Sequence, residues 1–176
     1  MDTEHIQKRL TDIFGPERPT RWVTRERPKI DRVACPWLIR RFLDPQAEIL
    51  YVPTEEVLKT ARQAKAEPFD IPNVRFSHRG ERCSFDAFIE DFGLDDRGLT
   101  ALAPIVRGAD TDSHYLAPEA AGLHAIALGM SASLKDDATL LAHGLEVYDW
   151  LYAWATQARG ERHDWVPSAV IVDAER

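Results

Sequence analysis

Two short polar segments combine a cysteine with acidic and basic side chains. The first contains Asp31, Arg32 and Cys35. A helix predicted to begin at Pro36, where the amide that proline lacks would be unpaired anyway, would place Cys35 at its N-terminus. Backbone amides and the helix dipole would there lower the pKa of the thiol and favour an anion. Two interpretations are open: a reactive thiolate beside an oxyanion site, or a small buried hydrophobic side chain next to Trp37.

The second polar segment holds His78, Arg79 and Cys83. Cys83 again precedes a predicted helix, here one over 85–92 that Ser84 could cap. The spacing of His78 and Cys83 matches no recognised zinc motif, so it is weak evidence for a metal. A polar loop between a strand and a helix is nevertheless a common place for a functional site. A solvated hairpin with the histidine bonded to backbone would explain the same residues.

A third segment offers metal ligands at alternate positions. Asp110, Asp112 and His114 connect two predicted helices, and carboxylates and imidazoles are ligands of divalent metals. The aspartates are equally ordinary turn formers, because their side chains bond to nearby backbone. Glu119 begins the next predicted helix, where an acid complements the helix dipole, and it could also face a site. His124 is predicted to be a partly buried, satisfied histidine.

Strands and helices must bring these segments together, and the hydrophobic pattern predicts both. Aromatic and β-branched residues predict strands over 21–25 and 47–52, with short extended pieces over 68–72 and 74–76. Helical spacing predicts helices over 4–14, 36–43, 55–65, 85–92, 96–107, 118–130 and 136–158. The predicted fold class is α+β or α/β, a small sheet in the N-terminal half packed against a largely helical C-terminal half. The expected divisions are a lead-in over 1–20, one domain over 21–158 and a tail over 159–176.

Length and composition exclude several classes of protein. The chain has 176 residues, 44% of them hydrophobic, and a formal net charge of −7. This fits one globular domain, and the acidic balance argues against direct binding to nucleic acid. No apolar run approaches the ~20 residues of a membrane helix. The N-terminus lacks the apolar stretch of a secretory signal, so we expect a cytoplasmic protein with two free thiols.

Five segments carry a resemblance to a known family. They are residues 29–42, 68–72, 77–86, 105–110 and 117–123. In this order they resemble the C-terminal domain of the ChrB-type chromate resistance family, from about residue 22 to 154. The resemblance implies a link to chromate resistance. Longer family members are described as chromate-responsive regulators or carry a rhodanese-like domain. The sequence shows neither a DNA-reading domain nor a rhodanese loop, so we expect neither DNA contact nor sulfur transfer.

The polar groups within these segments favour a metal-binding or redox enzyme that acts on a small anionic substrate. The candidate ligands of a transition metal (Fe, Mn or Zn) are Asp31, His78, Asp110 and Glu119. The other candidate catalytic residues are Arg32, Cys35, Arg79 and Cys83, the arginines orienting the anion. The alternative is an oxyanion sensor or accessory protein without catalysis, in which helix N-termini and arginines bind chromate. A homo-oligomer formed through the aromatic last helix also stays open.

Overall fold

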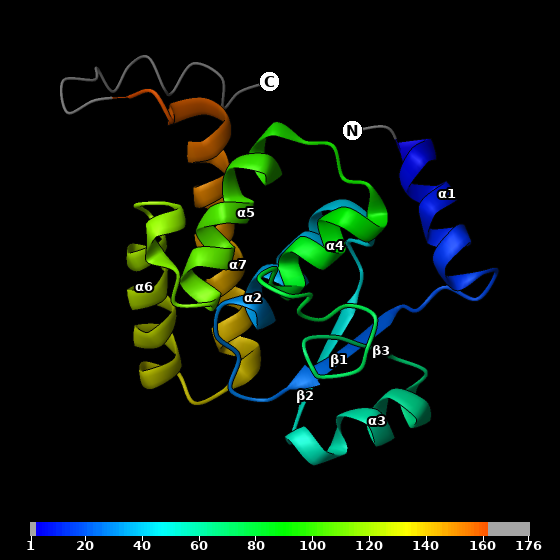
Figure 1. Ribbon diagram of the computed structural model, residues 1–176. Helices are drawn as coiled ribbons and strands as arrows, with labels where there is room; N and C mark the ends of the chain where they lie inside the picture. Colours follow the sequence, from blue (N-terminus) through cyan, green and yellow to red (C-terminus); the bar gives the residue numbers. More distant parts are fainter. Residues whose placement is uncertain (1–2, 162–176) are drawn as a thin grey trace.

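A three-stranded parallel sheet lies between one small helix and a larger group of helices (Figure 1). The computed structural model describes residues 3–161. The strand order is β2 (Glu48–Val52), β1 (Arg21–Arg25) and β3 (Glu67–Pro68), with β1 in the centre. Parallel neighbours need crossover connections, and each is a helical segment. The predicted strands over 21–25 and 47–52 are therefore confirmed to within one residue.

The two faces of β1 are covered by different hydrophobic clusters. Successive side chains of a strand point to opposite faces, so Trp22 packs in the main core and Val23 in a smaller cluster. Helix α3 (Val57–Ala64) supplies Val57 and Ala61 to the smaller cluster. It follows a 3₁₀ turn, η2 (Thr54–Glu56). In Figure 1 this helix lies by itself below the sheet.

The other helices pack around the main core. They are α1 (Thr3–Phe14), α2 (Asp31–Leu38), α4 (Ser84–Phe92), α5 (Arg97–Asp110), α6 (Ala120–Ser133) and α7 (Asp137–Ala153). Shorter helical pieces are η1 (Ile39–Leu43), η3 (His114–Leu116) and η4 (Trp154–Ala158). The predicted fold class, a small sheet in the N-terminal half and a largely helical C-terminal half, is confirmed.

An aromatic cluster joins the sheet to the helices. Trp22 of β1 contacts the rings of Phe76 and Phe88, and Phe76 stacks on Phe88 with ring centroids 4.5 Å apart. Helix α1, within the predicted lead-in, buries Ile6 and Leu10 in the same core. The predicted tail over 159–176 lies almost wholly outside the described residues.

The helix predicted to begin at Pro36 begins five residues earlier, at Asp31. Pro36 therefore lies inside α2, where its ring nitrogen cannot donate to the carbonyl of Arg32. The hydroxyl of Tyr51, on strand β2, donates to that carbonyl instead, at 2.6 Å. A distant side chain thus compensates for the proline, which local spacing could not show.

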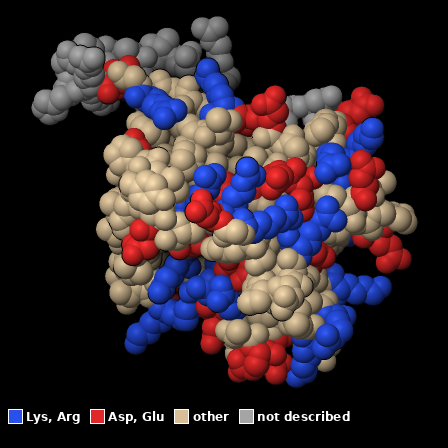
Figure 2. Space-filling model, in the orientation of Figure 1, with Lys and Arg blue, Asp and Glu red and all other residues tan. Residues whose placement is uncertain are grey.

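Acidic and basic side chains are interspersed over the face of the molecule in Figure 2. That face carries no large patch of a single sign. Within residues 3–161, no helix combines the length and apolarity needed to cross a bilayer.

Candidate functional site

Side chains from four separate parts of the chain meet beside the sheet. Asp31 is the first residue of α2 and Asp110 is the last residue of α5. His78 lies in the loop between β3 and α4, and Asp70 follows β3 by two residues. Arg25 is the last residue of the central strand β1. Parallel strands present their carboxyl ends at one edge, which is where open parallel sheets usually bind ligands.

His78 is the centre of a group of three carboxylates. Its Nε2 atom lies 3.1 Å from Oδ2 of Asp110, 3.5 Å from Oδ2 of Asp31 and 3.6 Å from Oδ1 of Asp70. One donor atom each of Asp31, His78 and Asp110 falls within 4.8 Å of the others. The structure thus brings together three of the four residues predicted as metal ligands.

Asp31 is the most buried carboxyl of this group, with 1% of its surface exposed. Burial raises its pKa well above the ordinary value, and the negative charges of Asp110 and Asp70 raise it further. One carboxyl oxygen accepts a hydrogen bond from the backbone amide of Ser84. The other, Oδ1, is a buried atom without a hydrogen-bond partner among the described residues. A buried carboxyl in this state would gain from a neighbouring cation.

Whereas the pKa of Asp31 shifts towards its neutral form, the pKa values of His78 and Asp70 shift in the direction that favours the charged form of each group. Hydrogen bonds to Asp110 and Asp70 raise the pKa of His78 to about 10, although its partial burial opposes this. Burial alone would raise the pKa of Asp70, but hydrogen bonds from His78, Ser84 and Arg25 outweigh burial and lower it. The cluster therefore already attracts positive charge, in the form of a protonated imidazole.

A pocket of about 340 Å³ opens beside this cluster. Its ionisable lining residues are Arg25, Lys29, Asp31, Arg32, Asp70, His78, Asp110, Asp112 and His124. Arg25 Nη2 lies 2.8 Å from Oδ2 of Asp70, and Arg32 Nε lies 3.5 Å from the same oxygen. The pocket includes Arg32, a candidate from the sequence, and also Arg25, which local spacing does not single out. The position of Arg25 at the carboxyl end of a predicted strand was the available signal.

Arg79, predicted to orient an anion, lies outside this pocket. Its guanidinium makes two hydrogen bonds to the carboxylate of Asp91, at 2.9 and 2.8 Å, and an ion pair with Glu90. Although partial burial alone would raise the pKa of Asp91, the bonds from Arg79 and Arg75 lower it. In the structure Arg79 holds its loop on α4 and is not among the residues that line this pocket. Spacing in the sequence does not show which arginine lines the pocket, because the direction of the Arg79 side chain depends on how its loop packs on α4.

We expect Arg79→Met to weaken folding without affecting the pocket. A carboxylate with a lowered pKa stabilises the fold above its unfolded pKa, and this contribution is lost as the pH falls through the folded value. The variant should therefore lose about 0.5–1 kcal/mol of unfolding free energy at pH 7. The loss should shrink only as the pH falls through the lowered folded pKa of Asp91, which lies below the ordinary value of about 3.9 for an aspartate. Urea unfolding followed from pH 7 down to about pH 2 measures this, and an equal loss over the whole range would contradict it.

Neither cysteine has the surroundings of a reactive thiolate. Cys35 lies inside α2 rather than at a helix N-terminus, so its predicted position is wrong. Cys83 does precede α4, as predicted. Both are fully buried free thiols, and burial, with the nearby charge of Asp31, raises the pKa of each. For Cys35 the structure agrees with the other interpretation, a small hydrophobic side chain of the core, and Cys83 is buried in the same core.

Both thiols should consequently resist modification in the native protein. With an aromatic disulfide reagent at pH 8, we expect reaction at least about 100-fold slower than for a free small thiol, because the thiolate is rare and enclosed. The same protein in concentrated denaturant should show two reactive thiols, which serves as the control. A thiol that reacts rapidly in the native state would contradict this assignment.

Glu119, the fourth predicted metal ligand, does not reach the cluster around His78. It directly precedes α6 and is partly buried. Asp112 and His114 also separate from Asp110, although they are close to it in sequence. They meet His124, which was predicted to be a satisfied histidine, in a second cluster.

The comparisons with known proteins agree with the resemblance noted above. Residues 22–155 match the family described as ChrB, C-terminal domain. Over 139 residues the chain is 38% identical to Protein ChrB of Cupriavidus metallidurans, a match that covers 78% of this chain and 41% of that protein. The chain thus matches less than half the length of this relative. No solved structure matches it. All residues of the cluster around His78 lie within the matched range, and the chain belongs to the ChrB family of chromate resistance through its C-terminal domain.

Proposed function

We propose that Asp31, His78 and Asp110 bind a divalent transition metal, and that the metal in turn binds a small oxyanion in the adjoining pocket. The observation that carries this proposal is the buried carboxyl of Asp31. It lies among two other carboxylates and has an oxygen without a partner among the described residues. Buried charges persist in proteins when they are paired or coordinate a metal, and a divalent cation at Oδ2, the carboxyl oxygen that faces His78, would neutralise the charge of this carboxylate.

The separations between the donor atoms support the proposal. Ligands bound at ~2.1 Å to one metal lie about 3.0–3.4 Å apart in octahedral or tetrahedral geometry. The Nε2 atom of His78 lies 3.1 Å from Oδ2 of Asp110 and 3.5 Å from Oδ2 of Asp31. A metal could therefore replace the proton of the imidazole with little movement. Two carboxylates and one imidazole suit Mn, Fe or Zn and leave positions open for a ligand.

The cationic side chains of the pocket favour an anion as that ligand. Arg25, Lys29 and Arg32 line the pocket together with four aspartates. A bound dication would shift this balance towards positive charge, and guanidinium groups bind oxyanions through paired hydrogen bonds. The family's link to chromate makes a tetrahedral dianion, chromate or sulfate, the candidate ligand. Reduction by thiols is not part of this proposal, because both cysteines are buried.

Metal analysis followed by calorimetry tests the proposal. Elemental mass spectrometry of protein purified without chelator should find at least one equivalent of a transition metal. After metal removal, Mn²⁺ should bind wild type at one site, and His78→Gln should weaken this binding at least about 100-fold. Chromate and sulfate should release heat only with the Mn²⁺-loaded protein.

Two arginine variants separate the metal from the anion. Arg25→Met should keep the Mn²⁺ site and lose oxyanion binding, because Arg25 lines the pocket. Arg79→Met is the matched control, since it removes a guanidinium from the same region but outside the pocket, and it should keep both. Equal oxyanion affinity with and without metal would overturn the proposal and favour a metal-independent sensor.

A further inference from the structure

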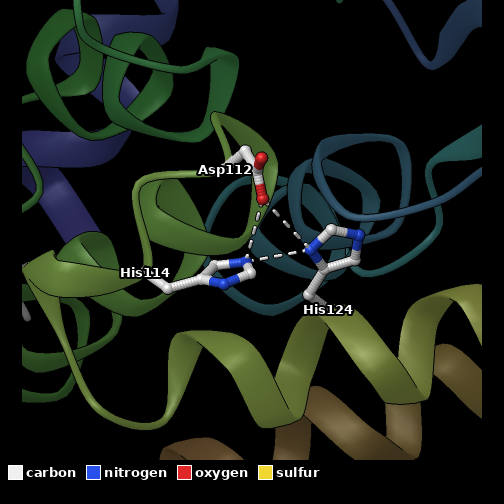
Figure 3. A group of neighbouring side chains, drawn as sticks. All are labelled: Asp112, His114 and His124. Atoms are coloured by element: carbon white, nitrogen blue, oxygen red, sulfur yellow. Dashed lines mark hydrogen bonds and ion pairs between the residues drawn. The ribbon is translucent and has the colours of Figure 1, made fainter.

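A second group of metal-ligand side chains lies on the same pocket, and the proposed centre does not use it. Asp112, His114 and His124 direct their donor atoms towards one another (Figure 3). We propose that these three residues form a second metal site, selective for an ion that prefers imidazole, such as Zn²⁺ or Co²⁺. The two sites are independent proposals, because they share no ligand.

The distances within this group fit a small metal ion. His114 Nε2 lies 2.9 Å from Nδ1 of His124 and 3.5 Å from Oδ1 of Asp112, and His124 Nδ1 lies 4.0 Å from the same oxygen. Three ligands of a tetrahedral zinc ion would lie about 3.3 Å apart. Movements of less than ~1 Å would therefore bring the three donor atoms into tetrahedral positions around a zinc ion and leave the fourth coordination position open.

The side chains that carry these atoms are already turned inwards. The two imidazole rings meet nearly edge to face with their centroids 5.1 Å apart, and one hydrogen bond joins Nε2 of His114 to Nδ1 of His124. Two neutral imidazoles can make that bond only if one ring presents its N–H to the other. A metal would exchange this single bond for one bond to each nitrogen.

Asp112 contributes a carboxylate that has few other contacts. Its side chain is 83% exposed, and its ion pairs among the described residues are with the two histidines. Its backbone has a left-handed conformation, with φ of 57°. Aspartate tolerates this conformation better than most residues, and here it turns the chain immediately after α5. The turn directs Asp112 towards the histidines, away from the cluster that contains Asp110.

Close packing holds the supporting elements in place. Gly108 of α5 is so near its neighbours that a Cβ atom there would lie 2.9 Å from Cβ of Ala120 and 3.0 Å from the carbonyl of Ser113. These contacts fix α5 against the start of α6, which carries His124, and against the residue before His114. A site built on such fixed elements needs little reorganisation to bind a metal.

The donor atoms distinguish the two sites. The second cluster has two imidazoles and one carboxylate, whereas the cluster around His78 has one imidazole and mainly carboxylates. Imidazole ligands suit Zn²⁺ and Co²⁺, and carboxylate ligands suit Mn²⁺. Asp112 and His124 line the same pocket as Asp31 and His78, so both metals would face one ligand space.

Zinc titration of the full chain, without a histidine tag, tests the inference. By calorimetry we expect two equivalents of Zn²⁺ for wild type, one for His124→Gln, one for His78→Gln and none for the double variant. Mn²⁺ binding should survive in His124→Gln. The control is His143→Gln, which removes an exposed histidine of α7 and should keep two equivalents.

A second variant guards against an effect on folding. Asp112→Asn changes a largely exposed side chain and should weaken the second zinc ion about 10-fold or more. Co²⁺ should give a visible absorption band that His78→Gln keeps and His124→Gln loses. Wild-type zinc binding in both His124→Gln and Asp112→Asn would overturn the second site. Two equivalents in His78→Gln would overturn the first site instead, so the failures are distinguishable.

Discussion

Asp31→Asn should raise the stability of the metal-free protein while it removes Mn²⁺ binding. The asparagine has the shape of the aspartate and can still accept the hydrogen bond from the Ser84 amide. It removes a charge that burial and two neighbouring carboxylates oppose. We therefore expect a gain of about 0.5–2 kcal/mol at pH 7, the range that single stabilising substitutions commonly give.

The pH dependence gives this prediction a defined sign. A carboxyl whose pKa is higher in the folded state than in the unfolded state binds its proton more tightly when the protein is folded. Its contribution to the free energy of unfolding is therefore most favourable at low pH, and it is lost as the pH rises through the folded pKa. Below about pH 4 wild type and Asp31→Asn should therefore be similarly stable, because Asp31 is protonated in both folded and unfolded wild type. The difference should grow towards neutral pH.

Thermal unfolding in EDTA and in Mn²⁺ measures both effects. In EDTA the variant should unfold at the higher temperature; in saturating Mn²⁺ the order should reverse, because only wild type binds the ion. Asp95→Asn, at an exposed aspartate outside the pocket, is the control and should show neither effect. A variant less stable than wild type in EDTA at pH 7 would contradict the prediction.

Arg107→Met should cause a large loss of stability. Arg107 of α5 makes two hydrogen bonds of 2.7 Å to the carboxylate of Asp86 on α4. Asp86 is only 6% exposed and also accepts from the backbone amide of Cys83. Removing one partner of a buried ion pair leaves the other charge uncompensated, which typically costs about 3–5 kcal/mol. Because Arg107 is partly exposed, we expect the lower end, about 3 kcal/mol.

A double-mutant cycle identifies the origin of this loss. Asp86→Asn combined with Arg107→Met should be more stable than Arg107→Met alone, since the buried charge is then absent. Arg62→Met, at an exposed position of α3, is the matched control and should change stability by less than about 0.5 kcal/mol. Urea unfolding of wild type, Arg107→Met, Asp86→Asn and the double variant gives the four free energies of the cycle. A loss below 1 kcal/mol in Arg107→Met would show that water replaces the guanidinium.

The candidate metal centre could be predicted in part because its residues lie at the ends of regular elements. Asp31, His78 and Asp110 stand in polar segments next to predicted strands and helices, and the ends of such elements tend to meet. The partner of each side chain was not predictable in the same way. Asp110 and Asp112 are near in sequence, yet the left-handed turn at Asp112 sends them to different clusters.

Errors arose where contacts distant in sequence outweigh local preference. Proline favours the first turn of a helix, but the hydroxyl of Tyr51 makes an interior position acceptable at Pro36. His124 is the partly buried histidine with a hydrogen-bond partner that the sequence predicts, but that partner, His114, comes from a short turn that periodicity does not detect. Each error therefore concerns a single tertiary contact, and the order of strands and helices was unaffected.

The contact between Tyr51 and the carbonyl of Arg32 also bears on how the chain folds. Helix α2 is short, and a helix of eight residues with an internal proline has little stability of its own in water. Its hydrogen bonding at Arg32 is completed only when strand β2 is in place. Helix α2 and the sheet should then form in one cooperative step. Since Asp31 begins α2, a nascent chain can place this carboxyl group only after residues up to Val52 have left the ribosome.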